Sequence, residues 1–290
     1  MSATMSPIAP APALVRGALD DPASLGLVGR LRWAARDGWL IARRDMDQWV
    51  REPQMIVWGL IYPIVFVLLF GYVFGSGIVV PGGGSYREFL MPGMFAQTMA
   101  FGIGETLAAV QADSQKGVMD RFRSMPMAPS AVVVGRCIAN MLYSTASLAL
   151  LVVVGLAIGW RWHGTPAETL TAFGLLLLLR LAFLWIGIYA GLKARSPEAA
   201  NAVYGLLYPV TMLSNAFIAP ELMPGWLGFL AELNPLSATI TATRELFGNP
   251  GVGSSGWLTE NALLLAVLWP IVITAVTLPM AVRAYQRLSR

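Results

Sequence analysis

Charged side chains are scarce in this chain of 290 residues. Asp, Glu, Lys and Arg together make up 12% of the sequence and hydrophobic residues make up 56%, whereas a soluble domain carries about 25% charged residues. The few charges are also clustered, which leaves several runs of about 20 residues nearly free of them. This composition excludes an ordinary soluble domain and indicates an integral membrane protein.

Histidine and cysteine, which often perform catalysis or hold metal ions, are almost absent. Cys137 is the single cysteine and His163 the single histidine. This excludes an intramolecular disulfide and a zinc cluster, and it leaves no Cys–His pair within reach. We expect His163 to be a solvated residue of an outer loop. The G-x-x-x-x-G-K-[ST] loop that cradles ATP phosphates is missing, so we predict a chain that is not an enzyme and binds no cofactor.

Six apolar segments are long enough to cross about 30 Å of hydrocarbon as α-helices. They are residues 55–74, 89–112, 137–159, 169–192, 199–219 and 261–282. The predicted fold is therefore an all-α integral membrane protein with six transmembrane helices, in one membrane domain over residues 55–290.

Basic residues are distributed unequally between the segments that connect these helices. With the N-terminus inside, 16 of the 20 Lys and Arg residues fall in the two tails and in residues 113–136 and 193–197. Arg87, Arg161 and Arg244 fall one each in the three outer loops. Because basic residues favour cytoplasmic loops, the sequence predicts a multi-pass protein of the plasma (inner) membrane with both termini cytoplasmic. The net charge of +4 is too small and too scattered to indicate nucleic-acid binding.

The region before the first predicted span divides into two parts. Residues 1–25 are rich in Pro, Ala and Ser without the pattern of a signal peptide, so we predict a disordered cytoplasmic tail. In residues 26–54, Leu31, Trp39 and Met46 lie on one helical stripe and arginines on the other faces. This pattern predicts an amphipathic interfacial helix in the headgroup layer; the alternative is a helix packed on a soluble domain.

The last outer loop, residues 220–260, is long and not very polar. We predict two short helices there, over residues 222–233 and 235–247, that are half-inserted into the outer leaflet. Backbone of this kind must be shielded by protein at membrane depth. We find no internal repeat of the kind that builds an inverted-repeat secondary transporter.

Two charges fall inside predicted spans, Glu105 and Arg180. A charge in the hydrocarbon costs about 3 kcal/mol on insertion scales, so it normally faces protein or a water-filled cavity. Three interpretations stay open. The two residues pair with each other, they border a substrate path, or they only fix the packing of helices.

Residues 113–129, with the sequence DSQKGVMDRFRSMPMAP, form a polar island between two apolar segments. We predict a short cytoplasmic helix here, which Pro126 and Pro129 end. Its apolar anchor could be formed by Val118, Met119, Phe122 and Met125. Such a helix is typical of contact with a soluble partner. The alternative, an ordinary cytoplasmic loop, explains the arginines but not Phe122.

Two motifs resemble those of type-2 ABC exporter permeases, and the island resembles the daunorubicin-resistance permease group in particular. The first is the pattern G-x-x-[DE]-R-[LF]-x-x-x-P, carried by Gly117, Asp120, Arg121, Phe122 and Pro126. The second is P-x-W, an apolar stretch, N-P-L and a later R, carried by Pro224, Trp226, Asn234, Pro235, Leu236 and Arg244.

The resemblance implies a membrane subunit that exports a hydrophobic or amphipathic drug or a lipid. It implies two partners besides membrane lipids: a separate ABC ATPase, which binds ATP and Mg, and a second permease subunit, identical or related. It assigns the coupling contact with the ATPase to Gly117, Asp120, Arg121, Phe122, Met125 and Pro126. It also assigns an outer re-entrant element to Trp226, Asn234, Pro235 and Arg244. A polysaccharide exporter of the same family, a proton-coupled secondary transporter using Glu105 and Arg180, and an intramembrane enzyme remain alternatives.

Overall fold

The computed structural model describes residues 39, 43, 53–75, 77, 80, 83–115, 129–251 and 256–287. Throughout these ranges the chain is helical or irregular and contains no β-strand, which confirms the predicted all-α class. The long helices are α2 (Pro53–Leu68, continued by the π-helix Leu69–Phe74), α3 (Tyr86–Gln115), α5 (Pro129–Ala157), α6 (Pro166–Lys193), α7 (Pro197–Met212) and α11 (Ala262–Arg287). The short ones are the 3₁₀ turn Pro220–Leu222, α8 (Gly225–Leu233), α9 (Pro235–Phe247) and α10 (Trp257–Glu260).

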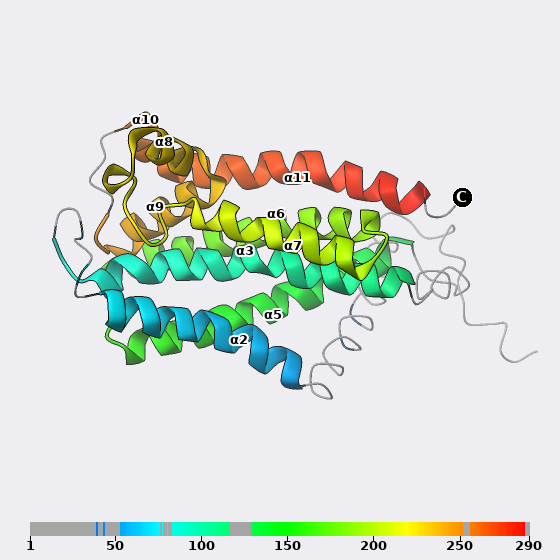
Figure 1. Cartoon of the computed structure of the whole chain (residues 1–290), viewed down its shortest axis with the longest axis horizontal. Coiled ribbons are helices and arrows are strands. Elements are labelled where there is room, and N and C mark those ends of the chain that lie inside the picture. Colours follow the sequence, from blue (N-terminus) through cyan, green and yellow to red (C-terminus); the bar gives the residue numbers. More distant parts are fainter. Residues whose placement is uncertain are drawn as a thin grey trace, which may run out of the picture.

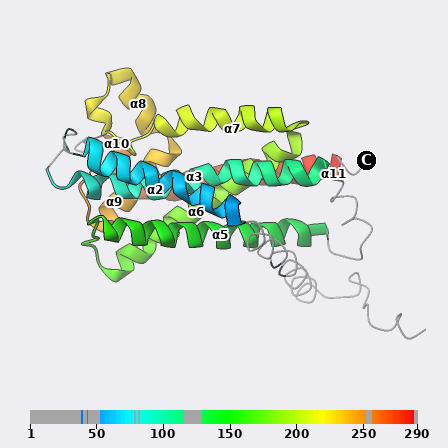
Figure 2. The same cartoon turned by 60° about the horizontal axis from the view of Figure 1, so that its bottom comes forward.

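The long helices lie side by side as a bundle, and the short helices gather at one end of it (Figure 1). Helices α3 and α6 form the centre and pack on each other more extensively than any other pair. Helix α11 packs on α6 and α9, whereas α2, α5 and α7 all contact α3. Figure 2 shows α7 and α5 on opposite sides of α3.

Two glycines allow the close approach of α3 and α6. Gly187 and Gly191 lie one turn apart on α6, where they face the carbonyl oxygens of Ile103 and Leu107 on α3. A Cβ atom would lie 2.8 Å from the first oxygen and 2.7 Å from the second. Only glycine fits at this distance, and such small-residue contacts are typical of helix packing in membranes.

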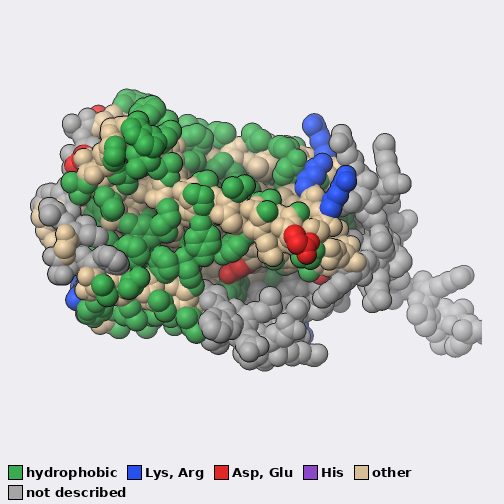
Figure 3. Space-filling model, viewed as in Figure 1, with side chains coloured by type: hydrophobic (Ala, Val, Ile, Leu, Met, Phe, Trp, Pro, Cys, Tyr) green, Lys and Arg blue, Asp and Glu red, His purple; other side chains and the backbone are tan. Residues whose placement is uncertain are grey.

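The outer surface of the bundle is apolar, as Figure 3 shows for one face. Among the described residues, three helical segments are long and apolar enough to cross a membrane: Gly135–Ala157, Pro166–Lys193 and Ala262–Tyr285. A shorter apolar helix covers Ile61–Val73. The chain is therefore a multi-pass membrane protein, while the count of six spans stays a prediction.

Helix boundaries differ from the predicted ones at instructive places. The predicted span over residues 199–219 ends as helix α7 at Met212, because the residues after it turn away and are held by side chains of other helices. The predicted helix over residues 235–247 is confirmed as α9. The one over 222–233 begins only at Gly225, directly after Pro224.

The N-terminal predictions fall mostly outside the described residues. Residues 1–25 lie outside them altogether. Of the predicted amphipathic helix, the structure describes Trp39, Arg43 and the last residues, which already belong to α2. Trp39 and Arg43 are helical, and the Trp39 side chain is 51% exposed.

Candidate functional site

Arg180 lies at the middle of the bundle and is fully buried. Its guanidinium donates to neutral side-chain oxygens of two neighbouring helices. Nε lies 2.6 Å from Ser144 Oγ, and Nη2 lies 3.1 Å from Thr106 Oγ1 and 3.4 Å from Asn140 Oδ1. A buried charge requires such hydrogen bonds, so Arg180 joins α6 to both α3 and α5.

The face of α3 that meets Arg180 provides both space and a hydrogen-bond acceptor for the guanidinium. A Cβ atom on Gly102 would lie 2.5 Å from the guanidinium carbon of Arg180, so the glycine leaves room for the planar group. Thr106, one turn further on, supplies one of its acceptors and is itself fully buried. Gly102 and Thr106 therefore mark the side of α3 that faces α6.

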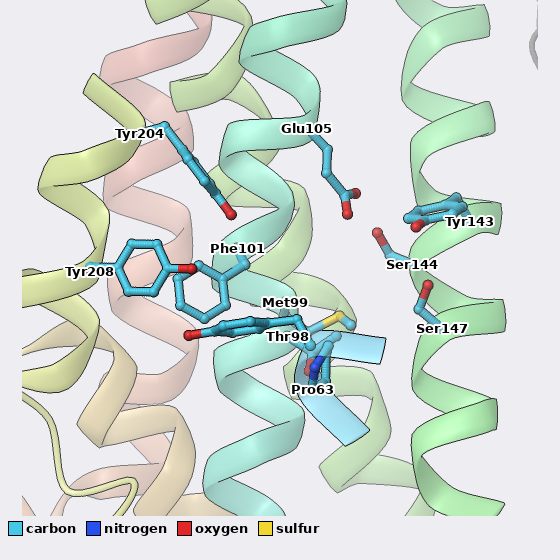
Figure 4. Close-up of a pocket in the computed structure, with 11 residues that line it drawn as sticks. Pro63, Thr98, Met99, Phe101, Glu105, Tyr143, Ser144, Ser147, Tyr204 and Tyr208 are labelled. Carbon is cyan, nitrogen blue, oxygen red and sulfur yellow. The ribbon is translucent and has the colours of Figure 1, made fainter. Parts of the chain in front are cut away.

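Glu105 points away from this side of α3. Its side chain is exposed and lines a cavity of about 190 Å³ between α2, α3, α5 and α7. Figure 4 shows Thr98, Phe101 and Glu105 of α3 along this cavity. Among the described residues no cation lies within 4.0 Å of the Glu105 carboxylate, so the interpretation that Glu105 and Arg180 form a direct ion pair is wrong.

Aromatic rings form one wall of the cavity. The Tyr62 and Phe101 rings meet edge to face at 5.6 Å, Phe101 lies 5.0 Å from Tyr208, and Tyr208 lies 6.0 Å from Tyr204. Tyr204 and Tyr208 are one turn apart on α7 and so share a face. Gly104 lets the Tyr204 ring approach α3, because a Cβ there would overlap the ring.

The opposite wall belongs to α5, which carries Tyr143, Ser144 and Ser147 along the cavity (Figure 4). Ser144 also accepts the hydrogen bond from Arg180. This leaves the Ser144 hydroxyl proton to be donated elsewhere. Ser144 therefore connects the buried arginine to the cavity.

A second fully buried arginine, Arg244 of α9, holds the irregular segment after α7. Its Nε donates to Phe89 O at 2.9 Å, and its Nη2 donates to Asn215 O at 2.7 Å and Ala216 O at 3.2 Å. The guanidinium also stacks on the Phe89 ring, 3.7 Å from its centre. Arg244 thus links the irregular segment after α7, through the carbonyls of Asn215 and Ala216, to the first turn of α3.

Asn234 holds the same segment from the other side. Its Nδ2 donates to Val210 O in the last turn of α7 at 2.8 Å and to Leu213 O, directly after the helix, at 2.6 Å. Its Oδ1 accepts from Leu236 N, which caps the start of α9, and Pro235 occupies the first helical position. Trp226 is 69% exposed on α8 and takes no part in these contacts.

His163 is less isolated than predicted. Its ring lies 3.1 Å from the Glu88 carboxylate, although the side chain is 55% exposed. Its backbone N–H donates to Phe247 O at the end of α9. The loop after α5 is therefore tied to both α3 and α9.

At the opposite end of the bundle, Arg136 of α5 forms an ion pair with Asp113 of α3, and both side chains are largely buried. Asp113 is the first residue of the polar island identified in the sequence, and Arg136 lies two turns into α5, the helix that follows the island. The predicted coupling residues Gly117, Asp120, Arg121, Phe122, Met125 and Pro126 lie outside the described residues.

Glu105, Arg180 and Arg244 were identified from the sequence, but most of the residues that surround them were missed. The tyrosines of the cavity and the polar partners of the arginines were not predicted: Tyr62, Tyr204, Tyr208, Thr106, Asn140, Ser144 and Asn215. A signal was present, because Asn140, Ser144 and Ser147 recur at spacings of four and three within an apolar run. Spacing alone does not say which neighbour such a face meets.

A multi-pass helical membrane protein with buried arginines and a polar cavity is the class that this fold and site define. The family model described as ABC-2 type transporter matches residues 37–247. The chain is 32% identical to the daunorubicin resistance ABC transporter permease protein DrrB1 of Streptomyces coeruleorubidus, over 79% of this chain and 81% of that protein. The chain belongs to the ABC-2 type transporter family.

More distant relatives are also transport permeases by name. The probable multidrug ABC transporter permease YbhR of Escherichia coli K12 is 22% identical over 70% of this chain and 53% of that protein. The probable doxorubicin resistance ABC transporter permease protein DrrC of Mycobacterium tuberculosis is 20% identical over 79% of this chain and 84% of that protein. The resemblance noted in the sequence is thereby confirmed at the level of the family.

Proposed function

We propose that this chain is the membrane-spanning subunit of an ABC exporter that moves a hydrophobic or amphipathic drug or a lipid out of the cytoplasm. A separate subunit hydrolyses the ATP. The observation that carries the proposal is the 32% identity to a daunorubicin resistance permease over 79% of this chain. The cavity, with apolar rings on one side and polar groups on the other, supports an amphipathic cargo.

In this proposal six helices span the plasma membrane, both termini are cytoplasmic, and a second permease completes the transport path. The separation of basic residues between the two ends of the bundle supports this orientation. Lys193, Arg195 and Arg136 lie at one end with the C-terminus of α11, whereas Arg87 and Arg161 lie at the other (Figure 1). The first end would face the cytoplasm.

The polar island would receive the force from the ATPase through Gly117, Asp120, Arg121, Phe122, Met125 and Pro126. The Asp113–Arg136 ion pair supports this role, because it joins the two helices from which the island emerges. A displacement of the island would therefore reach α3 and α5 together. These are two of the helices that line the cavity.

Transport into inside-out vesicles containing this chain and its ATPase tests the proposal. We expect ATP-driven accumulation of a hydrophobic drug or a labelled lipid, and none with an ATPase that binds but does not hydrolyse ATP. Accumulation driven by a proton gradient alone would contradict the proposal in favour of a secondary transporter. Accumulation of a labelled polysaccharide only would keep the family mechanism and contradict the cargo.

A further inference from the structure

The described residues that line the cavity carry electron-rich groups and a single charge. The charge is the carboxylate of Glu105. Around it lie the faces and hydroxyls of Tyr62, Tyr204 and Tyr208 and the hydroxyls of the α5 wall. Aromatic faces and hydroxyl oxygens attract cations, and an anion would find no basic side chain among these lining residues.

The Glu105 carboxylate is available to bind a cation, because Arg180, the buried arginine of α6, forms its hydrogen bonds on another face of α3. Arg180 donates to Ser144, Thr106 and Asn140 and has no exposed surface. Among the described residues no ion pair within 4.0 Å joins Arg180 to Glu105. The carboxylate of Glu105 lines the cavity instead (Figure 4).

We propose that this cavity binds the cationic headgroup of an amphipathic cargo, with Glu105 as the counter-ion and the tyrosine rings of α2 and α7 as the wall. The inference rests on the exporter function proposed above and adds the charge of the cargo and the place where it is recognised. A carboxylate that meets an ammonium group away from water forms a strong charge-assisted hydrogen bond.

The volume limits which part of the cargo enters. At about 190 Å³ the cavity is smaller than the roughly 300 Å³ at which pockets for drug-sized ligands begin. It admits an amine with one aromatic ring, and the rest of the molecule must lie outside.

Binding of two matched probes to the complete transporter tests this proposal. The probes are 4-phenylbutylamine and 4-phenylbutanol, which share one ring and chain but differ in charge at neutral pH. Affinity is measured by NMR titration of the permease–ATPase complex in lipid nanodiscs, with empty nanodiscs as the control for partition into lipid. We expect the amine to bind about tenfold more tightly than the alcohol, since a hydrogen bond to a charged group contributes more than a neutral one.

Substitutions in the chain test whether the amine binds in the cavity beside Glu105. Glu105→Gln should weaken the amine about tenfold and leave the alcohol unchanged, whereas Glu105→Asp should retain the preference for the amine. Tyr208→Leu should weaken both probes. Glu260→Gln, which removes an exposed carboxylate on α10 outside the cavity, should change neither.

Equal affinities for the two probes, no binding of either, or an unchanged amine affinity in Glu105→Gln would overturn the proposal. ATP-driven transport by the same preparations separates it from the exporter function. Transport without any preference for cations contradicts only the headgroup site. Amine binding that depends on Glu105, in a complex that exports nothing, contradicts only the exporter function.

Discussion

Arg180 and Arg244 are both fully buried, but they bind different kinds of oxygen. Arg180 donates to hydroxyl and amide oxygens on side chains of α3 and α5. Arg244 donates to backbone carbonyls of Phe89, Asn215 and Ala216. Side-chain oxygens can follow a change of rotamer, whereas carbonyl oxygens move only with the backbone.

The difference assigns separate tasks to the middle of the bundle, around Arg180, and to the end that carries the short helices, around Arg244. The region around Arg244, together with Asn234, fixes a buried irregular stretch of backbone, where unpaired carbonyls are costly. The region around Arg180 joins three helices through contacts that can rearrange, next to the cavity. We infer that the region around Arg244 sets the fold of its end of the bundle and that the region around Arg180 permits helix movement during transport.

The largest expected effect is the loss of Arg244. Arg244→Met keeps much of the side-chain volume but leaves the Asn215 and Ala216 carbonyls without their donor. Because each buried group left unsatisfied costs about 1–3 kcal/mol, we expect a loss of about 3–5 kcal/mol of stability. Arg244→Lys should not rescue it, because one ammonium cannot reproduce the planar fork. Membrane abundance and thermal unfolding measure the effect, with Arg283→Met, an exposed site on α11, as control. Normal abundance of Arg244→Met would break the comparison.

Arg180→Met should cost less, about 2 kcal/mol, because its partners are neutral side chains that can find other partners. The variant should reach the membrane but lose transport per molecule, since α6 loses its hydrogen bonds to α3 and α5. Thermal unfolding and transport at matched membrane levels measure the two effects. A loss of stability as large as that of Arg244→Met would remove the distinction between the two regions.

Asn234→Ala removes the donor to the carbonyls in and directly after the last turn of α7, and it removes the cap of α9. We expect a loss of about 1–2 kcal/mol, comparable to that of a helix cap. Combined with Arg244→Met, the loss should be less than additive, because both residues hold one segment. Additive losses measured by thermal unfolding would show that the two contacts act independently.

Ser144→Ala should have the smallest effect, about 1 kcal/mol, because Arg180 keeps Thr106 and Asn140 as acceptors. Thr145→Ala, next to it on α5 and exposed, is the matched control and should change stability by less. Thermal unfolding of both variants checks the order. A larger loss in Thr145→Ala would mean that the hydrogen bond to Arg180 contributes nothing.

The sequence predicts best where local chemistry decides the structure. Helix α9 has the predicted bounds because Asn234 caps its start and Gly248 ends it in the left-handed conformation, with φ of 65°. The predicted continuation of α7 to residue 219 is wrong because Arg244 and Asn234, distant in sequence, capture that backbone. Local patterns do not contain such tertiary contacts.

At the cavity and the buried arginines, too, local chemistry was predictable and tertiary contacts were not. Insertion cost alone identifies Glu105 and Arg180 as residues that need polar surroundings. Their separation was not predictable, because it depends on which faces of α3 meet α6 and α7. Gly102 and Thr106 face Arg180, while Phe101 and Glu105 face the tyrosines. The tyrosine wall was missed for the same reason.

The central claim, that a separate ATPase drives this chain through the polar island, is tested most directly by co-purification of that ATPase with Phe122→Ala at matched membrane levels. Truncation of a buried aromatic anchor costs about 2 kcal/mol or more, which weakens association about thirtyfold. We therefore expect much less ATPase to be recovered with Phe122→Ala, and nearly normal recovery with Arg123→Ala, whose charge contributes about 1 kcal/mol or less if exposed. Full ATPase recovery together with full transport in Phe122→Ala would contradict the claim.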